Sequence, residues 1–462
     1  MHDIRLSIQS HAGVLALCLL GCGTWRADPD GLTERDVALL PELVLTGRLP
    51  SHPGNELIGD PAVALLGQQL FFDKGLSTGA IDGARSITPV SCVSCHNPGE
   101  WFSDARGENN VSKGVGVTSR NSPSLVNVAF YDTFGWDGRA DTLWGQCANG
   151  YEPVGTMRGN PALLLEAVRS RYADRYAAVF PGQPLPAADA GVAVDDFYRN
   201  ILKTWATYLT QLTSADAPFD RFALGDREAL TVEQRRGLVL FLGKAGCIEC
   251  HRGPMFTDNA YHSVGIGQSG RGVPETDLGR EKGLSVLKTL DDRRLRPEGA
   301  APPPAPTLED RGLFRTKGLR QVAGTAPYFH AGQVATLKDA VWFYARGGDH
   351  AGAGTTSPFL VPLHLSDDEQ ADLVSFLRSL TGAEIAPELR CDNARPAPLP
   401  GAYLDGGVFV LPPDLSTAPI ATGDPVCPFG GVLVTQDAGG QLNFTRVCNA
   451  APTVTRCAGA AP

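Results

Sequence analysis

The chain has 462 residues, a formal net charge of −10 and 19% charged residues. This length predicts two or three domains, and the composition is typical of a globular rather than a disordered protein. The acidic balance, without any run of lysine or arginine, argues against nucleic acid as a partner. No stretch approaches the ~18 consecutive apolar residues of a membrane-spanning helix.

The first 22 residues resemble an export signal. Arg5 gives a weak positive start, a short apolar run follows, and the sequence LLGC at 19–22 resembles a lipobox. Cys22 would then be lipidated and become the mature N-terminus, which predicts a lipid-anchored protein of the periplasm or cell envelope. An ordinary secretory signal or a buried N-terminal helix is the alternative. Residues 23–50 are expected to form a linker.

Two short motifs share the pattern C-x-x-C-H. They comprise Cys92, Cys95 and His96, and then Cys247, Cys250 and His251. Zinc or a redox disulfide would also suit a C-x-x-C pair, but neither requires a histidine directly after the second cysteine. The full pattern is the attachment site of a c-type haem, whose iron the histidine binds. The sequence therefore predicts two covalent c-type haems.

The residues after the two motifs indicate an internal duplication. The sequence WFSD follows the first motif at 101–104, and MFTD follows the second at 255–258. Each ends in an aromatic residue, a hydroxyl residue and aspartate, at nearly the same distance from the histidine. This repetition predicts two related haem domains, over 51–225 and 226–385.

The scaffold around the motifs is predicted to be mainly α-helical. An apolar stripe at three- and four-residue spacing, formed by Phe197, Ile201, Trp205, Tyr208 and Leu212, is typical of an amphipathic helix. Capping boxes at 231–234 and 366–369 predict two further helix starts. The stretch between 265 and 312 has the composition of a loop and is expected to be an insertion over the second domain.

The last part of the chain, 386–462, has a different composition. It contains four cysteines, Cys391, Cys427, Cys448 and Cys457, within a Pro-, Gly- and Ala-rich sequence. In an exported chain these cysteines predict two disulfides, for which three pairings are possible. We expect a small β-rich appendage, with a hairpin between 427 and 449 that a disulfide closes near its ends.

The supply of further iron ligands differs between the two haem motifs. None of the nine histidines lies between His96 and His251, and Met157 is the only soft candidate ligand in that interval. An iron with an open position can bind peroxide, whereas an iron with both axial positions filled can only pass electrons. The sequence therefore predicts that the first haem is open.

Seven segments, in this order, resemble the bacterial di-haem cytochrome c peroxidases and their MauG-type relatives. They are LGQQLFFDKGLS, SCVSCHNP, RNSPSLVN, GWDGRA, CIECHRGPMFTD, TAPYFHAG and LSDDEQADLVSFLRSL, between about 65 and 382. The resemblance implies an all-α fold of two cytochrome c-like haem domains with long irregular loops and a calcium ion between the haems. It also implies a reaction with hydrogen peroxide.

The resemblance also assigns roles to individual residues. It makes the haem on His96 the peroxidatic one and Trp136, of the WDGR motif, the relay between the haems. Calcium would be held by three residues, namely Asn121 and the backbone carbonyls of Thr325 and Pro327. The second haem's distal ligand would be Tyr344, fourteen residues after the histidine of YFH, where the classical peroxidases have methionine. A phenolate is a hard anionic ligand that lowers the potential of a haem, whereas a tyrosine that merely packs in a helix is the alternative.

One position departs from the family pattern. The family has a distal glutamate twenty residues after the WDGR tryptophan, where this chain has Thr156. Gln146 retains the glutamine of MauG-type pockets, and Glu152 is the nearby carboxylate that would move the peroxide proton in place of the missing glutamate. Cys147 is either a small buried apolar residue or a thiol exposed to oxidant.

The sequence thus predicts an exported di-haem oxidoreductase that activates hydrogen peroxide. Its partner would be an electron-donor or substrate protein, such as a c-type cytochrome, a cupredoxin or a protein modified by oxidation. Tyr344 favours a modified protein, as for MauG. The alternatives are an electron-transfer cytochrome without efficient peroxidase activity, which Thr156 would suit, and a lipid-anchored scaffold recruited through the cysteine-rich tail.

Overall fold

The computed structural model describes most of the chain between residues 31 and 392, together with three strands beyond it. The described ranges are 31–77, 89–106, 111–289, 299, 301–392, 408–409, 431–436 and 442–447. The predicted export signal and lipidation site at Cys22 lie outside these ranges. No helix within them is both long and apolar enough to cross a membrane.

One group of helices forms a first hydrophobic core. It comprises α2 (Pro61–Phe72), α3 (Leu143–Tyr151), α4 (Pro161–Arg171), α5 (Ala173–Val179) and α6 (Val192–Leu209). The predicted stripe is confirmed in α6, and its last member, Leu212, lies buried just after the helix end. Helices α2 and α6 pack closely because Gly67 has no side chain, and a Cβ there would lie 2.3 Å from the carbonyl oxygen of Thr204.

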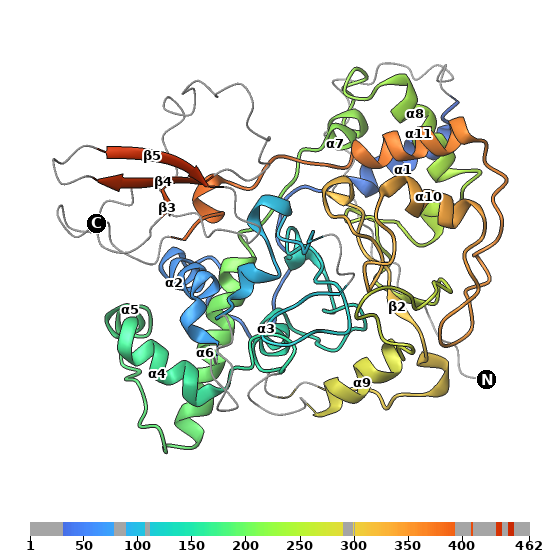
Figure 1. Cartoon of the computed structure of the whole chain (residues 1–462). Coiled ribbons are helices and arrows are strands. Elements are labelled where there is room, and N and C mark those ends of the chain that lie inside the picture. Colours follow the sequence, from blue (N-terminus) through green and yellow to red (C-terminus); the bar gives the residue numbers. More distant parts are fainter. Residues whose placement is uncertain are drawn as a thin grey trace, which may run out of the picture.

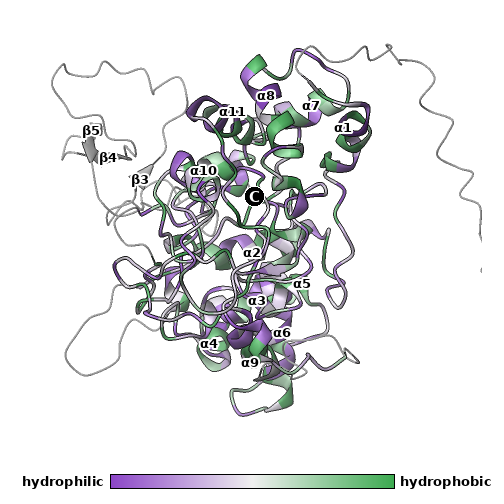
Figure 2. Ribbon diagram, turned by 90° about the vertical axis from the view of Figure 1, so that its right-hand side faces the viewer, coloured by the Kyte–Doolittle hydropathy of each residue, from purple (hydrophilic) through white to green (hydrophobic). Residues whose placement is uncertain are grey.

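A second group of helices forms a separate core (Figure 1). It comprises α1 (Glu34–Leu39), α7 (Pro218–Ala223), α8 (Val232–Leu242), α10 (Leu337–Ala345) and α11 (Asp367–Arg378). Both predicted capping boxes are present, at Thr231 before α8 and at Ser366 before α11. Gly237 allows α8 to approach the backbone of α11, because a Cβ would lie 2.0 Å from the carbonyl oxygen of Asp372. Helices such as α1 and α7 carry both hydrophobic and hydrophilic residues, as amphipathic helices do (Figure 2).

Short 3₁₀ turns and two-residue strands complete the helical scaffold. The 3₁₀ turns are η1 (Leu40–Leu43), η2 (Lys74–Leu76), η3 (Cys92–Ser94), η4 (Pro98–Glu100), η5 (Val128–Phe130), η6 (Cys247–Glu249), η7 (Leu308–Asp310), η8 (Val322–Gly324) and η9 (Pro387–Leu389). Strands β1 (Tyr261–His262) and β2 (Phe314–Arg315) pair antiparallel. Both C-x-x-C-H motifs begin in such a turn, which gives them the same local backbone.

Two segments differ from the sequence-based expectation. The segment 23–50, expected to be a linker, contains α1 and η1, and Leu40 and Leu43 of η1 pack into the second core. The stretch between 265 and 312, expected to be a loop, contains α9 (Arg280–Thr289). This stretch also contacts the first half of the chain, since the guanidinium of Arg120 forms a buried ion pair with Asp277 at 2.7 Å. The glycine- and proline-rich sequence around α9 did not indicate this helix of ten residues.

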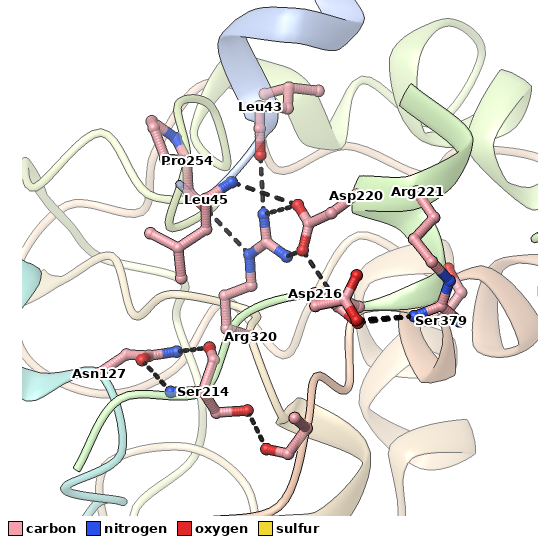
Figure 3. A network of polar contacts seen from close by, with 12 residues as sticks. Leu43, Leu45, Asn127, Ser214, Asp216, Asp220, Arg221, Pro254, Arg320 and Ser379 are labelled. Carbon is pink, nitrogen blue, oxygen red and sulfur yellow. Dashed lines mark hydrogen bonds and ion pairs between the residues drawn. The ribbon is translucent and has the colours of Figure 1, made fainter. Parts of the chain in front are cut away.

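A buried ion pair fixes η1, α7 and the loop after β2 to one another (Figure 3). The guanidinium of Arg320 lies 2.6 and 2.7 Å from the carboxylate oxygens of Asp220, and both side chains are at most 3% exposed. Arg320 also donates to the carbonyl oxygens of Leu43 and Pro254. Asp220 in turn accepts from the backbone N–H of Leu45. Arg320 therefore links the backbone at Leu43 and at Pro254 to Asp220 of α7 without leaving a buried charge unpaired.

The tail contains a three-stranded antiparallel sheet in the order β3 (Val408–Phe409), β4 (Gly431–Gln436) and β5 (Leu442–Val447). The hairpin predicted between 427 and 449 is present as the β4–β5 pair. Cys391 is disulfide-bonded. The other three late cysteines lie outside the described residues, so the predicted pairing of the four stays a prediction.

Candidate functional site

The second C-x-x-C-H motif lies on a cavity of about 330 Å³. Cys247, Cys250 and His251 line it, and so does Tyr344 from α10. The walls between them are mainly apolar and come from α8, α10 and α11, with Phe241, Leu337, Val341, Leu373 and Leu377 among them. The predicted proximal and distal ligands of the second haem therefore share one apolar cavity.

Both motif histidines are held in the same way, by a backbone carbonyl oxygen close to Nδ1. The Nδ1 atom of His96 lies 3.1 Å from the carbonyl oxygen of Phe102, and that of His251 lies 2.9 Å from the carbonyl oxygen of Phe256. Both phenylalanines are fully buried and have a left-handed backbone, with φ of 55° and 53°. Since Nδ1 is engaged with a carbonyl, Nε2 remains to bind a metal, as in other metal-binding histidines. Burial lowers the pKa of both imidazoles, which favours their neutral, ligating form.

The four motif thiols are free cysteines and not redox disulfides. Burial raises the pKa of Cys92 to about 12, of Cys95 to about 11 and of Cys247 to about 12. Catalytic redox cysteines have a lowered pKa instead, so this environment does not fit a C-x-x-C redox pair. Two free thiols, a neutral imidazole with an available Nε2 and an apolar cavity do fit a covalently attached haem.

The first motif lies in the core of the α2–α6 group. Val93, Phe102 and Met157 are buried there, and the sulfur of Met157 lies 3.8 Å from the sulfur of Cys92. The thiol of Cys147 faces its own helix, 3.4 Å from the carbonyl oxygen of Leu143, and burial raises its pKa. It is therefore a small, partly buried residue and not a reactive thiolate.

Two buried indole N–H groups bear on the fit of a haem to this first core. Neither Trp144 nor Trp205 has a hydrogen-bond partner for its Nε1 atom within the described part of the chain. Unpaired buried donors cost free energy, so such atoms call for an acceptor that the polypeptide does not supply. A haem carboxylate is an acceptor of the kind they lack.

The residues predicted for the relay and for calcium converge on the cavity of the second motif. Trp136, Asn121, Thr325 and Pro327 all line it. The indole N–H of Trp136 donates to the carbonyl oxygen of Asn121 at 2.8 Å, which fixes the ring. The side-chain amide of Asn121 donates to the carbonyl oxygen of Asp104, eight residues after His96. Trp136 is thus tied to segments that belong to both motifs.

The ring of Trp136 also meets two residues that the sequence did not single out. The Nζ atom of Lys317 lies 4.6 Å from the centre of the ring, and the imidazole of His330 meets it edge-on at 6.5 Å. Burial, followed by the charge of Arg315, lowers the pKa of Lys317 well below its usual range. Burial likewise lowers the pKa of His330 to about 4. Their positions just after β2 and within YFH carried no signal of this contact.

A charged cluster lies beside the relay residue. Asp137 is fully buried and pairs with Arg120 at 2.7 Å and with Arg139 at 2.8 Å. Burial alone would raise the pKa of Asp137, but the two guanidinium groups lower it below its usual value. Asp137 therefore stays ionised and committed to these arginines.

The residues predicted for peroxide chemistry lie at and after the end of α3. Gln146 is within the helix, and Glu152 is its C-cap. One carboxylate oxygen of Glu152 accepts a hydrogen bond from the phenol of Tyr198 on α6 at 2.8 Å. The hydroxyl of Thr156 donates to the carbonyl oxygen of Pro153. Tyr198 was not predicted as part of this site, because only the packing of α3 on α6 brings it to Glu152.

A cluster of Cys250, Asp258 and His262 has the ligand types of a metal site. The imidazole of His262 lies 2.9 Å from the carboxylate of Asp258. Cys250 belongs to the second C-x-x-C-H motif, however, and its sulfur is needed for haem attachment. We therefore assign this cluster to the surroundings of the haem motif.

Comparisons with known proteins agree with this geometry. Residues 61–228 match the family model of the di-haem cytochrome c peroxidases. A cytochrome-c peroxidase, IdrP1, of Pseudomonas sp. strain SCT is 33% identical over 351 residues, which cover 73% of this chain and 84% of that protein. The methylamine utilization protein MauG of Methylorubrum extorquens is 32% identical over 363 residues, which cover 78% of this chain and 88% of that protein.

A solved structure supports the same relationship. A MauG-like protein associated with microbial copper homeostasis matches with a TM-score of 0.59 and 26% identity, over 76% of this chain and 99% of that one. The mainly helical fold agrees with these relatives. The chain therefore belongs to the family of di-haem cytochrome c peroxidases and MauG proteins, and it is a peroxidase-type oxidoreductase.

Proposed function

We propose that the chain is an exported enzyme that uses hydrogen peroxide to oxidise a partner protein. The observation that carries this proposal is the pair of equivalent histidine sites, the second of which shares a cavity with Tyr344. The haem on His96 would supply peroxide activation, and the haem on His251 would supply electron transfer. The remaining roles belong to side chains of this chain.

The proposed ligands of the second haem are His251 and Tyr344. Burial raises the pKa of Tyr344, and the nearby thiols of Cys247 and Cys250 add to this shift. The phenol therefore stays protonated unless a metal ion binds its oxygen. Its packing against Phe329 and Phe343 fixes the ring at the cavity. A haem iron bound to the phenol oxygen would displace its proton, and the resulting tyrosinate would lower the potential of that haem.

The proposed electron relay is Trp136. Its N–H bond to Asn121 and its place on the cavity hold the indole between the segments of the two motifs. Calcium, proposed at Asn121, Thr325 and Pro327, would hold the same segments together, since oxygen ligands from separate loops suit this ion.

Peroxide would be oriented by Gln146 and deprotonated with the help of Glu152. A glutamine can donate and accept hydrogen bonds but cannot carry the proton, which leaves the carboxylate for this role. The bond from Tyr198 fixes the position of the Glu152 carboxylate. Thr156, whose hydroxyl is bonded to the backbone, is not assigned a role in proton transfer.

The setting of the enzyme follows from the sequence. We propose a periplasmic or cell-envelope location, with a lipid anchor at Cys22 and haem domains at 51–225 and 226–385. The partner would be a c-type cytochrome, a cupredoxin or a protein modified by oxidation, and Tyr344 favours the last. The tail at 386–462 has no assigned chemistry.

A second candidate function is electron transfer without efficient peroxidase activity. The observation that favours it is the hydrogen bond between Glu152 and Tyr198, which holds the carboxylate against α6. If that bond kept Glu152 from the peroxide, proton transfer would lose a contribution of about 10² to 10⁴ in rate.

Ligand binding to the resting protein tests the proposed open site. The ferric two-haem protein should show a high-spin component in its electron paramagnetic resonance spectrum and bind cyanide at one haem without prior reduction. It should also consume peroxide with a reduced small c-type cytochrome as electron donor. A wholly low-spin protein that binds cyanide only after partial reduction would contradict the proposal and point to Met157 as a ligand.

A further inference from the structure

Lys317 occupies an unusual place for a lysine. It lies two residues after β2, lines the cavity of the second motif, and places Nζ 4.6 Å from the ring centre of Trp136 and 5.8 Å from that of Tyr131. Within the described ranges its Nζ makes no ion pair with a carboxylate. Lys317 is half-buried, and a lysine partly withdrawn from water normally pairs with an anion, because an unpaired charge there is costly.

The neighbours of Lys317 add positive charge and do not neutralise it. Arg315 is 3% exposed, lines the same cavity, and has no hydrogen-bond partner for its Nε atom among the described residues. Arg120 is also close enough to interact with Lys317 electrostatically. The carboxylate that acts on Lys317, Asp137, is already shared by Arg120 and Arg139. Asp132 acts electrostatically on Arg315. Among the described residues Lys317 therefore has no carboxylate partner of its own.

A haem supplies such an anion, because it carries two carboxylates on one edge of an otherwise apolar ring. The cavity has the matching polarity, with leucine and phenylalanine on the walls from α8, α10 and α11. Its cationic side chains are Lys317 over the ring of Trp136 and Arg315 over the ring of Tyr131. We propose that Lys317, supported by Arg315, binds a carboxylate of the second haem and thereby holds that haem edge against Trp136. The inference rests on the proposed function, since it requires a haem at this motif.

Two consequences follow from the geometry. A paired ammonium next to the haem edge stabilises the reduced haem, which has one positive charge fewer at the iron, so Lys317 raises the potential of the second haem. The same side chain lies over the ring of Trp136 and fixes the relay relative to the haem carboxylate. Lys317 is therefore a positioning residue. It sets the potential of the second haem and the position of Trp136 relative to the haem carboxylate.

The test is Lys317→Met in the holoprotein, with Lys317→Arg as the conservative variant. Lys338→Met is the matched control, because this exposed lysine on α10 loses the same charge next to a residue that lines the cavity. Spectroelectrochemistry should show a lower midpoint potential for one of the two haems in Lys317→Met only. Resonance Raman spectra should show a shifted haem-carboxylate bending band in the same variant, and Lys317→Arg should largely restore both signals.

Two results would overturn the inference. One is a Lys317→Met protein with both haems attached, unchanged potentials and an unchanged carboxylate band. The other is an equal change in Lys338→Met, which would show a general charge effect. If Lys317→Met does not fold, Lys317→Gln, which keeps a polar side chain without the charge, takes its place under the same criteria. Absence of the second haem from the wild-type protein would instead contradict the proposed function.

Discussion

Replacing Asp220 with asparagine should destabilise the part of the protein that holds the second haem motif. Asp220 is 2% exposed, and its carboxylate pairs with both terminal nitrogens of Arg320 at 2.6 and 2.7 Å. The change leaves a buried guanidinium without its counter-charge. Breaking such a pair costs about 3–5 kcal/mol, and for a unit of 150–250 residues this corresponds to a drop in Tm of about 6–20 °C.

The same substitution should disturb the second haem more than the first. Arg320 donates to the carbonyl oxygen of Pro254, and its guanidinium lies 5.2 Å from the ring centre of Phe256. The carbonyl of Phe256 orients His251, so a displaced Arg320 changes the support of that histidine. Thermal unfolding followed at the absorption bands of the two haems measures both effects.

The matched control is Asp216→Asn, which removes an acid from the same region (Figure 3). Asp216 pairs with Arg221 at 3.4 Å, and its side chain is 72% exposed. An exposed pair of this kind contributes about 0–1 kcal/mol. Equal shifts in Tm for the two variants would refute the assignment of a special role to the buried pair.

Three further predictions concern the site. Because burial holds the pKa of His330 at about 4, against about 6.5 when unfolded, its contribution is complete above pH 6.5 and is lost as the pH falls towards 4. Chemical denaturation should show that the free energy of unfolding falls by about 3 kcal/mol over this pH window. The substitution His330→Gln should abolish this fall. Tyr344→Phe should change the ferric resonance Raman and paramagnetic resonance signals of one haem only, whereas unchanged signals would mean that Tyr344 only packs. Glu152→Gln should slow peroxide consumption by about 10² to 10⁴ without affecting cyanide binding, and Thr156→Glu should add little. The reverse pattern for these two variants would favour the electron-transfer function.

The sequence predicted those features that are encoded locally. The two C-x-x-C-H motifs, the capping boxes at Thr231 and Ser366 and the stripe of α6 all appear where the pattern placed them. The duplication also has a structural counterpart, since Phe102 and Phe256 accept from the two motif histidines in the same way. Short-range spacing fixes each of these arrangements, so a single sequence carries enough information.

Features that depend on distant contacts could not be predicted. Arg320 and Asp220 are 100 residues apart, and Glu152 meets Tyr198 only because α3 packs on α6. Lys317 follows a two-residue strand and has no neighbouring motif residue that would indicate its contact with Trp136. The helix α9 was overlooked because its glycine- and proline-rich surroundings are typical of loops.

The most direct test of the account is the intact mass of the protein after expression with haem-maturation machinery. The account predicts two covalently attached haems. Replacing Cys92 and Cys95 together with alanine should remove one of them, and the same change at Cys247 and Cys250 should remove the other. A wild-type mass with one haem or none would contradict the assignment of both motifs and, with it, the proposed reaction.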